Sequence, residues 1–214
     1  ASFLGRASAD KWDIIIWQIR MPQALTAVAA GAGLAVAGAM MQSILRNPLG
    51  SPFTLGISHA AAFGVALCVM LAGPGTLQAT GSGPMQALAP YAVTLSAFVF
   101  SLAATFIIIA ISRTRSASPE VMVLAGVALG SLFTAGTMFL QYFADDVELA
   151  AMVFWTFGDV SRASWQELGV IAGVLAVVAV YGFIKRWDYN AIDAGDETAK
   201  GLGVRVERVR LVGM

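Results

Sequence analysis

The residues with the most suggestive spacing lie on one face of an expected helix between positions 121 and 143. Gly126, Gly130, Thr134, Thr137 and Gln141 follow one another at steps of four, four, three and four. Residues at these steps share one face of an α-helix. Such a face could line an aqueous path, or it could pack against another helix, because small residues let two backbones approach closely. The spacing leaves both interpretations open.

Groups capable of covalent, acid–base or metal chemistry are few. His59 is the single histidine and Cys68 the single cysteine, and neither belongs to a cluster with the spacing of a metal site. The sequence contains no Walker-type phosphate loop. We therefore expect no catalytic residue, metal site or cofactor, which disfavours an intramembrane enzyme. We interpret His59 as a packed helix-end residue and Cys68 as a small buried apolar residue.

The elements that must position these residues are membrane spans. Hydrophobic residues make up 58% of the chain and charged residues 12%, whereas a soluble domain is about half apolar and about a quarter charged. No Asp, Glu, Lys or Arg occurs from Asn47 to Ser112. The sequence predicts an all-α, polytopic transmembrane helical bundle in contact with lipid, and no basic stripe suggests nucleic acid. Five segments approach the roughly 20 residues that a span needs: Pro22–Leu45, Phe53–Leu71, Leu88–Ile111, Val121–Phe143 and Leu168–Ile184.

The basic residues indicate how these spans are oriented. With five spans, nine of the 13 Lys and Arg residues fall on one side, and cytoplasmic loops are enriched in these residues. The nine are Arg46, Arg113, Arg115, Lys185, Arg186, Lys200, Arg205, Arg208 and Arg210. The N-terminal segment is then expected outside the cell. Because an outside start suggests a preceding span, and an apolar run begins at "RVRLVGM", we expect the chain to be incomplete at both ends.

The tail after the fifth span, "KRWDYNAIDAGDETAKGLGVRVERVRL", predicts a short cytoplasmic helix. Asp193 or Asp196 could cap its start, and Gly201 and Gly203 would end it. A helix of about two turns is marginal alone in water, so it should dock on something. It could rest on its own membrane domain, or it could sit in a cleft of a cytoplasmic subunit.

Four ordered blocks of this sequence resemble one known family. They are "WQIRMPQALTAVAAGAGLAVAGAMMQSILRNPLGSPFTLGISHAAAFG", "VLAGVALGSLF", "WTFGDVSRASW" and "NAIDAGDETAKGLGV". They are similar to the bacterial permease subunits of ATP-binding cassette importers for iron–siderophore, haem and cobalamin. The resemblance implies ten spans per subunit, of which this chain would hold the second to the sixth as a single permease domain over residues 1–214.

The resemblance also implies a function and a set of partners. A second permease subunit would complete a homodimer, a separate cytoplasmic ATP-binding subunit would hydrolyse ATP, and a periplasmic binding protein would deliver the cargo. The cargo expected from the resemblance is ferric siderophore, with haem or cobalamin as alternatives, and the location is the bacterial cytoplasmic membrane. A truncated, non-transporting membrane scaffold remains the alternative from another functional class.

Individual residues carry over from the family blocks. Gly130, Thr134, Thr137 and Gln141 would line the translocation path, and Arg20 would contact the binding protein, although it could instead anchor the membrane interface beside Trp17. Gln23 stands where the family often has a second arginine. A cytoplasmic coupling segment over residues 189–204 would dock on the ATPase. Its expected contact residues are Asp193, Ala194, Gly195, Asp196, Glu197, Thr198, Lys200, Gly201, Leu202 and Gly203.

Overall fold

The computed structural model describes residues 10–73, 84–114, 118–161 and 163–214, and every regular element in these ranges is a helix. This confirms the all-α fold. In chain order the helices are α1 (Asp10–Asp13), the π-helix η2 (Ile14–Arg20), α2 (Met21–Leu45), α3 (Ile57–Ala72), α4 (Pro84–Thr114), α5 (Pro119–Phe143), α6 (Asp146–Phe157), α7 (Trp165–Asp193), α8 (Asp196–Gly201) and α9 (Val206–Gly213).

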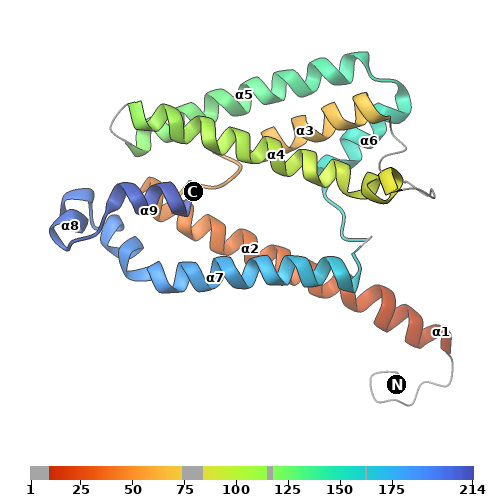
Figure 1. Cartoon of the computed structure of the whole chain (residues 1–214), viewed down its shortest axis with the longest axis horizontal. Coiled ribbons are helices and arrows are strands. Elements are labelled where there is room, and N and C mark those ends of the chain that lie inside the picture. The colour runs from red at the N-terminus through yellow and green to blue at the C-terminus, as the bar shows by residue number, and fades with distance from the viewer. Residues whose placement is uncertain (1–9, 74–83, 115–117, 162) are drawn as a thin grey trace.

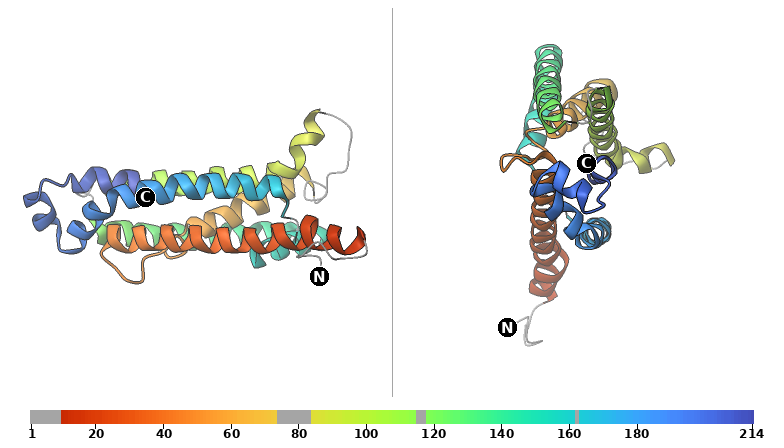
Figure 2. Two further views of the ribbon diagram at one scale, coloured as in Figure 1. Left: turned by 90° about the horizontal axis from the view of Figure 1, so that it is seen from below. Right: turned by 90° about the vertical axis from the view of Figure 1, so that its left-hand side faces the viewer.

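The helices form two groups that lie side by side (Figure 1). One group pairs α2 with α7, and the other packs α3 against α4, α5 and α6. The long helices run roughly parallel, with α8 and α9 at one end of the molecule and α1 at the other (Figure 2). Contacts of α2 with α5 join the two groups, and α9 packs against α2 and α7 of the first group.

Each of the five expected spans coincides with one helix. Four helical segments are long and apolar enough to cross a membrane: Ile14–Leu45, Tyr91–Arg113, Pro119–Phe143 and Trp165–Asp193. The remaining one, α3, is a shorter apolar helix of 16 residues. It begins at Ile57 rather than at Phe53, where the expected span began, because Gly56 has a φ of 71° and interrupts the helical path. The chain is a multi-pass membrane protein.

The first span begins earlier than the sequence suggested. The expected span began at Pro22, a residue without a backbone N–H that fits a first helical turn, but the helix is continuous from Ile14 to Leu45. The turns before the proline are π-helical, and the N–H of Met21 donates to the carbonyl of Ile16, five residues earlier. The wider π turns therefore bring the helix up to the proline without ending it.

Two helices were not foreseen in the sequence. α6 occupies the connection between the fourth and fifth expected spans, and it begins with a capping box in which Asp145 and Glu148 satisfy each other's backbone N–H groups. α9 follows the tail helix and returns the chain toward the membrane-facing helices (Figure 1). The two short helices lie at opposite ends of the molecule (Figure 1).

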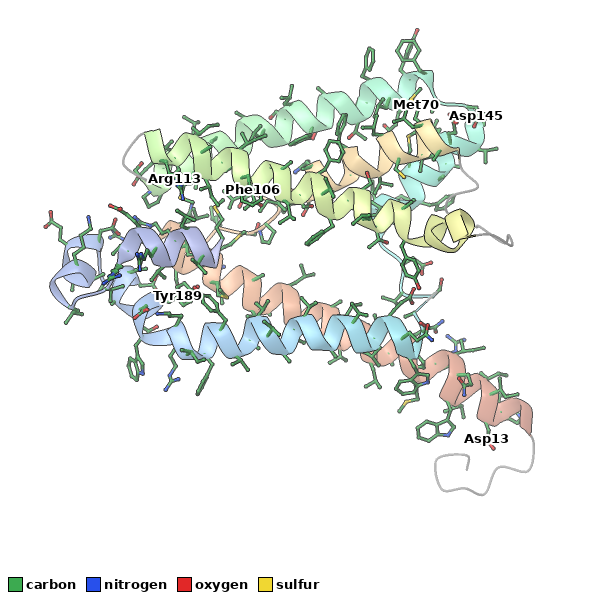
Figure 3. All side chains as sticks on the ribbon, in the orientation of Figure 1. Asp13, Met70, Phe106, Arg113, Asp145 and Tyr189 are labelled. Atoms are coloured by element: carbon green, nitrogen blue, oxygen red, sulfur yellow. The ribbon has the colours of Figure 1, made fainter. Side chains whose placement is uncertain are left out.

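Buried side chains gather in two clusters. The first joins the ends of α2, α4, α5, α7, α8 and α9, and the second joins α3, α4 and α6. Figure 3 places Arg113 and Tyr189 near the first cluster, and Asp13 and Asp145 at the opposite end. Elsewhere the long helices expose apolar side chains; in the most apolar window of α7 no residue is buried. An apolar surface this extensive needs lipid or further protein to cover it.

Candidate functional site

The glycines of α5 form a close helix contact. A Cβ atom at Gly126 would lie 2.7 Å from the Cα of Leu55, and one at Gly130 would lie 3.1 Å from the Cα of Gly56. Gly56 is equally crowded, because its own Cβ would lie 2.7 Å from the backbone N of Gly130. The GxxxG pair therefore lets α5 rest directly on the turn that precedes α3, as small residues do in membrane helices.

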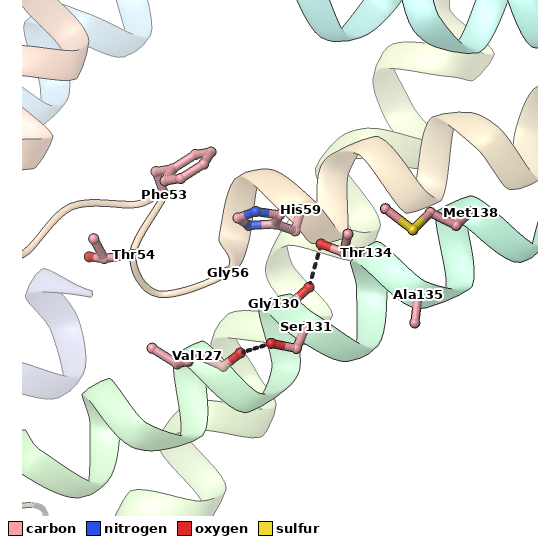
Figure 4. A pocket seen from close by; sticks show the side chains of 11 residues that line it. Phe53, Thr54, Gly56, His59, Val127, Gly130, Ser131, Thr134, Ala135 and Met138 are labelled. Atoms are coloured by element: carbon pink, nitrogen blue, oxygen red, sulfur yellow. Dashed lines mark hydrogen bonds between the residues drawn. The ribbon is translucent and has the colours of Figure 1, made fainter.

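A pocket of about 510 Å³ opens beside this contact (Figure 4). Its walls come from the turn before α3, the first turn of α3 and one face of α5. The lining residues are Phe53, Thr54, Gly56, His59, Gly126, Val127, Gly130, Ser131, Thr134, Ala135 and Met138. The wall is mostly apolar with a few hydroxyl groups and one imidazole, which is the usual make-up of a small-molecule site.

His59 is the most polar group in the pocket wall. Its ring lies 4.6 Å from the ring of Phe53, centroid to centroid. Its Nδ1 is buried and has no hydrogen-bond partner among the described residues. A neutral imidazole carries its proton on one nitrogen only, and a buried N–H without an acceptor is costly. This burial favours the tautomer protonated on Nε2.

The four expected path residues divide into two pairs. Gly130 and Thr134 line the pocket, whereas Thr137 and Gln141 are not among its lining residues. The hydroxyl of Thr134 donates to the carbonyl of Gly130 at 2.8 Å, and that of Thr137 donates to the carbonyl of Phe133 at 2.9 Å. Both hydroxyl protons are therefore used inside α5, so each threonine oxygen is left only as a hydrogen-bond acceptor.

Sequence reasoning missed most of the pocket wall. Ser131, Ala135 and Met138 form a second stripe on α5, one residue away from the glycine stripe, and the helical period could have identified it. Phe53 and Thr54 carried no such signal, because they lie in an irregular turn. His59 was interpreted as a packed helix-end residue. It lies in the first turn of α3, but it also lines the pocket.

The expected coupling residues form a compact turn at the end of the molecule opposite α1. Asp193 is the last residue of α7 and accepts a hydrogen bond from the Ser43 hydroxyl at 3.0 Å. Gly195, with a φ of 120°, takes the N-cap position that the sequence assigned to an aspartate. Asp196 instead pairs with Arg210 in α9, at 2.7 Å for each carboxylate oxygen.

The remaining coupling residues differ in how far they are exposed to solvent. Ala199 is fully buried and fastens α8 to the first core cluster. Most of the other residues are exposed, and Leu202 is 71% exposed. The exposed residues of the segment are Asp193, Ala194, Glu197, Thr198, Lys200, Gly201, Leu202 and Gly203. An anchored turn with an exposed apolar tip is suited to binding a partner.

Arg20 lies at the other end of the molecule. It is exposed at the end of η2, one residue before α2 begins. Nearby, the indole Nε1 of Trp165 donates to the carbonyl of Trp17 at 3.0 Å. The side-chain amide of Gln23 donates to the carbonyl of Ser161 at 2.8 Å. Gln23 therefore links α2 to the connection before α7. Of the two positions where the family often has arginine, only Arg20 carries a positive charge here, and it is exposed.

Comparison with known proteins places this geometry in context. The model of the FecCD transport family matches residues 1–214. A Methanocaldococcus jannaschii protein, provisionally assigned as an ABC transporter permease, is 52% identical over 205 residues, covering 96% of this chain and 58% of that protein. The hemin transport system permease HmuU of Yersinia pestis is 36% identical over 197 residues, covering 92% and 56%.

Comparison with solved structures also finds an ABC transporter. One described as an inward-facing conformation of a provisionally assigned metal-chelate type ABC transporter superposes with a TM-score of 0.81 at 26% identity. The match covers 97% of this chain and 62% of the other. The chain thus spans less than two thirds of the length of these relatives. The matches confirm the family resemblance drawn from the four sequence blocks.

Proposed function

Because this chain belongs to the FecCD transport family, we propose that it acts as the permease subunit of a binding-protein-dependent ATP-binding cassette importer in the cytoplasmic membrane. A second permease subunit would complete the path, and a separate ATPase would supply the energy. The observation that carries the proposal is the pocket of about 510 Å³ between α5 and the turn before α3. On α5 it is lined by Gly130 and Thr134 of the expected path stripe and by the neighbouring stripe of Ser131, Ala135 and Met138.

The chemistry of the pocket suits a large chelate that passes through without tight binding. Its wall offers aromatic and thioether surface from Phe53 and Met138, together with single polar groups from His59 and Thr134. Gly130 and Thr134 are path residues in this proposal, and Thr137 and Gln141 would continue the path along α5. An outwardly apolar chelate with peripheral oxygen atoms could slide along such a wall.

The proposed cargo is a ferric siderophore. Relatives named for hemin, vitamin B12 and Fe(3+)-citrate transport make other chelates the second candidates. All four are metal complexes of an organic ligand, so a weakly polar pocket suits the whole class. The choice among them belongs to the binding protein, for which exposed Arg20 is the proposed contact on the outer face.

The turn from Asp193 to Gly203 is the proposed docking site for the ATPase. It is anchored through Ala199 and exposes Leu202 and its charged neighbours at the end rich in Lys and Arg. Because cytoplasmic ends of membrane proteins carry this excess, the turn would face the compartment that contains ATP. The permease itself would have no catalytic role, since hydrolysis would take place in the partner.

The proposal is tested by transport in liposomes. The full-length protein is reconstituted with its ATPase and binding protein, and ATP-dependent uptake of ferric siderophore, haemin, cobalamin and ferric citrate is measured. Uptake of one chelate, abolished by a non-hydrolysable ATP analogue, is the expected result. A complex that hydrolyses ATP and binds the loaded binding protein, yet moves none of these chelates, would support the non-transporting scaffold instead.

The place of the pocket in the path is tested by thiol labelling. Ala135 and Ala128 are both exposed alanines of α5, but only Ala135 lines the pocket. In a Cys68→Ser background, cargo trapped in the complex should slow labelling of Ala135→Cys and leave that of Ala128→Cys unchanged. Equal rates at the two positions, with and without cargo, would exclude the pocket from the path.

A further inference from the structure

Arg210 of α9 is a charged side chain buried among apolar ones. It is only 4% exposed. Its Nη1 and Nη2 each donate to one carboxylate oxygen of Asp196 at 2.7 Å, and its Nε donates to the carbonyl oxygen of Ile44 at 3.1 Å. One guanidinium therefore binds two elements at once: the first turn of α8 and the last turn of α2.

The hydrogen bond from Arg210 gives the carbonyl of Ile44, in the last turn of α2, a partner. The last carbonyl groups of a helix have no partner within the helix, and a cation at this end is favoured by the helix dipole. Arg46 ends α2 in the left-handed conformation, at a φ of 49°. A second link runs alongside, because the Ser43 hydroxyl donates to Asp193 at 3.0 Å. The end of α2 is thus bonded to both sides of Gly195.

The end of α2 leads directly to the pocket. The side-chain amide of Gln42 donates to the carbonyl of Pro48 at 2.9 Å, which fixes the start of the connection to α3. That connection continues to Leu55, which is fully buried. Phe53, Thr54 and Gly56 of the same connection form one wall of the pocket. A displacement of the last turn of α2 would therefore move this wall relative to α5.

We propose that Arg210 is a positioning residue that makes the turn 193–203 and the last turn of α2 move as one body. A displacement of α8 would then move the pocket wall through α2 and the connection at residues 46–56. This route would add to the covalent connection through α7. The proposal rests on the proposed function, in which an ATPase docks on this turn. Arg46 adds little, because its nitrogen lies 4.0 Å from Asp196 and both side chains are partly exposed.

Two variants of α9 separate this role from a general loss of charge. Arg210→Gln removes the link, and Arg208→Gln removes the same charge from an exposed position of the same helix. In the reconstituted full-length complex, cargo uptake per ATP hydrolysed should fall at least about fivefold in Arg210→Gln, the low end of typical coupling between sites. It should remain unchanged in Arg208→Gln, and both variants should bind the ATPase as the unmodified protein does.

Hydrogen exchange gives a readout that a merely structural role would not produce. When the ATPase binds to the unmodified protein, exchange should slow both in residues 193–203 and in the last turn of α2. In Arg210→Gln it should slow in residues 193–203 alone. Unchanged uptake per ATP, or slowing in both segments of the variant, would overturn the proposal. So would a loss of ATPase binding that lowers hydrolysis and uptake in the same proportion.

A further variant tests the link if Arg210→Gln fails to assemble into the transport complex. Asp196→Asn keeps the shape of the side chain and leaves the Arg210 bond to Ile44, while weakening the charge-assisted pair. It should lower uptake per ATP in the same direction as Arg210→Gln, and unchanged coupling would count against the link. If the unmodified protein neither binds the ATPase nor takes up cargo, the proposed function itself fails, and this result is distinct from uncoupling in a variant.

Discussion

At the scale of single residues, the molecule depends on glycines that permit close backbone contact. Gly126 and Gly130 of α5 meet the turn at Leu55 and Gly56, and no larger side chain would fit between the two backbones. Gly31 of α2 is a contrasting case, because a Cβ there would find no atom within 4 Å among the described residues. The same residue type thus has a packing role at Gly126 and, among the described residues, none at Gly31.

This contrast gives a prediction. Gly126→Ala should lower the free energy of unfolding by about 1–3 kcal/mol, because the new methyl group would overlap the backbone of Leu55, which cannot rotate away. Gly31→Ala should leave it unchanged or raise it by up to about 1 kcal/mol, since alanine favours a helix over glycine. The measurement is thermal unfolding of the full-length protein in detergent. Equal effects of the two substitutions would refute the close contact.

At the scale of elements, α6 shows how a connection between spans becomes a helix. The carboxylate of Asp145 accepts hydrogen bonds from the N–H groups of Val147 at 2.9 Å and Glu148 at 2.7 Å. The carboxylate of Glu148 accepts one from the N–H of Asp145. The apolar face of α6 then buries Met152 against α3 and α4. The cap starts the helix, and the buried face holds it in place.

The cap can be tested separately from the packing. Asp145→Ala should destabilise α6 by about 1 kcal/mol, because two backbone N–H groups lose their acceptor. The neighbouring Asp146→Ala, which removes a charge without removing a cap, should cost less. Hydrogen exchange at the amides of Val147 and Glu148 checks the prediction: it should accelerate in the first variant only. Similar acceleration in both variants would show that charge, and not capping, stabilises this end.

At the scale of the whole molecule, one apolar cluster joins the two helix groups. Ile44 of α2 and Ile192 of α7 are buried together with Ile108 of α4 and Met122 of α5, so the cluster draws on both groups. The same cluster surrounds the Arg210 bond to Ile44. Elsewhere the two groups touch chiefly where α2 meets α5. The cluster is therefore the part of the described structure that fixes the turn 193–203 relative to the pocket.

A core substitution tests this role. Ile192→Ala should lower the free energy of unfolding by about 2–5 kcal/mol, because it leaves a cavity among side chains from several helices. Val177→Ala, on the same helix but 71% exposed, should stay within about 0.5 kcal/mol. Thermal unfolding in detergent checks both values. A small effect at Ile192 would mean that the cluster packs loosely and cannot transmit movement between the groups.

The sequence alone determined the features that depend on local composition and order. Runs of apolar residues located the four helical segments long enough to cross a membrane and the shorter apolar helix α3, because length and lack of charge are properties of consecutive residues. The four family blocks identified the family for the same reason, since each is a continuous string. Of the predicted path residues on α5, Gly130 and Thr134 line the pocket and Thr137 and Gln141 do not, and their role in a path stays a prediction.

Only the tertiary structure decided what depends on residues far apart in the chain. The start of α3 at Ile57 follows from the contact of Gly56 with Gly130, 74 positions later. The pairing of Asp196 with Arg210, and of Arg210 with Ile44, selected partners that spacing along one helix does not reveal. Phe53 reaches the pocket from an irregular turn. No local pattern encodes such contacts, because they arise when packed helices bring distant backbones together.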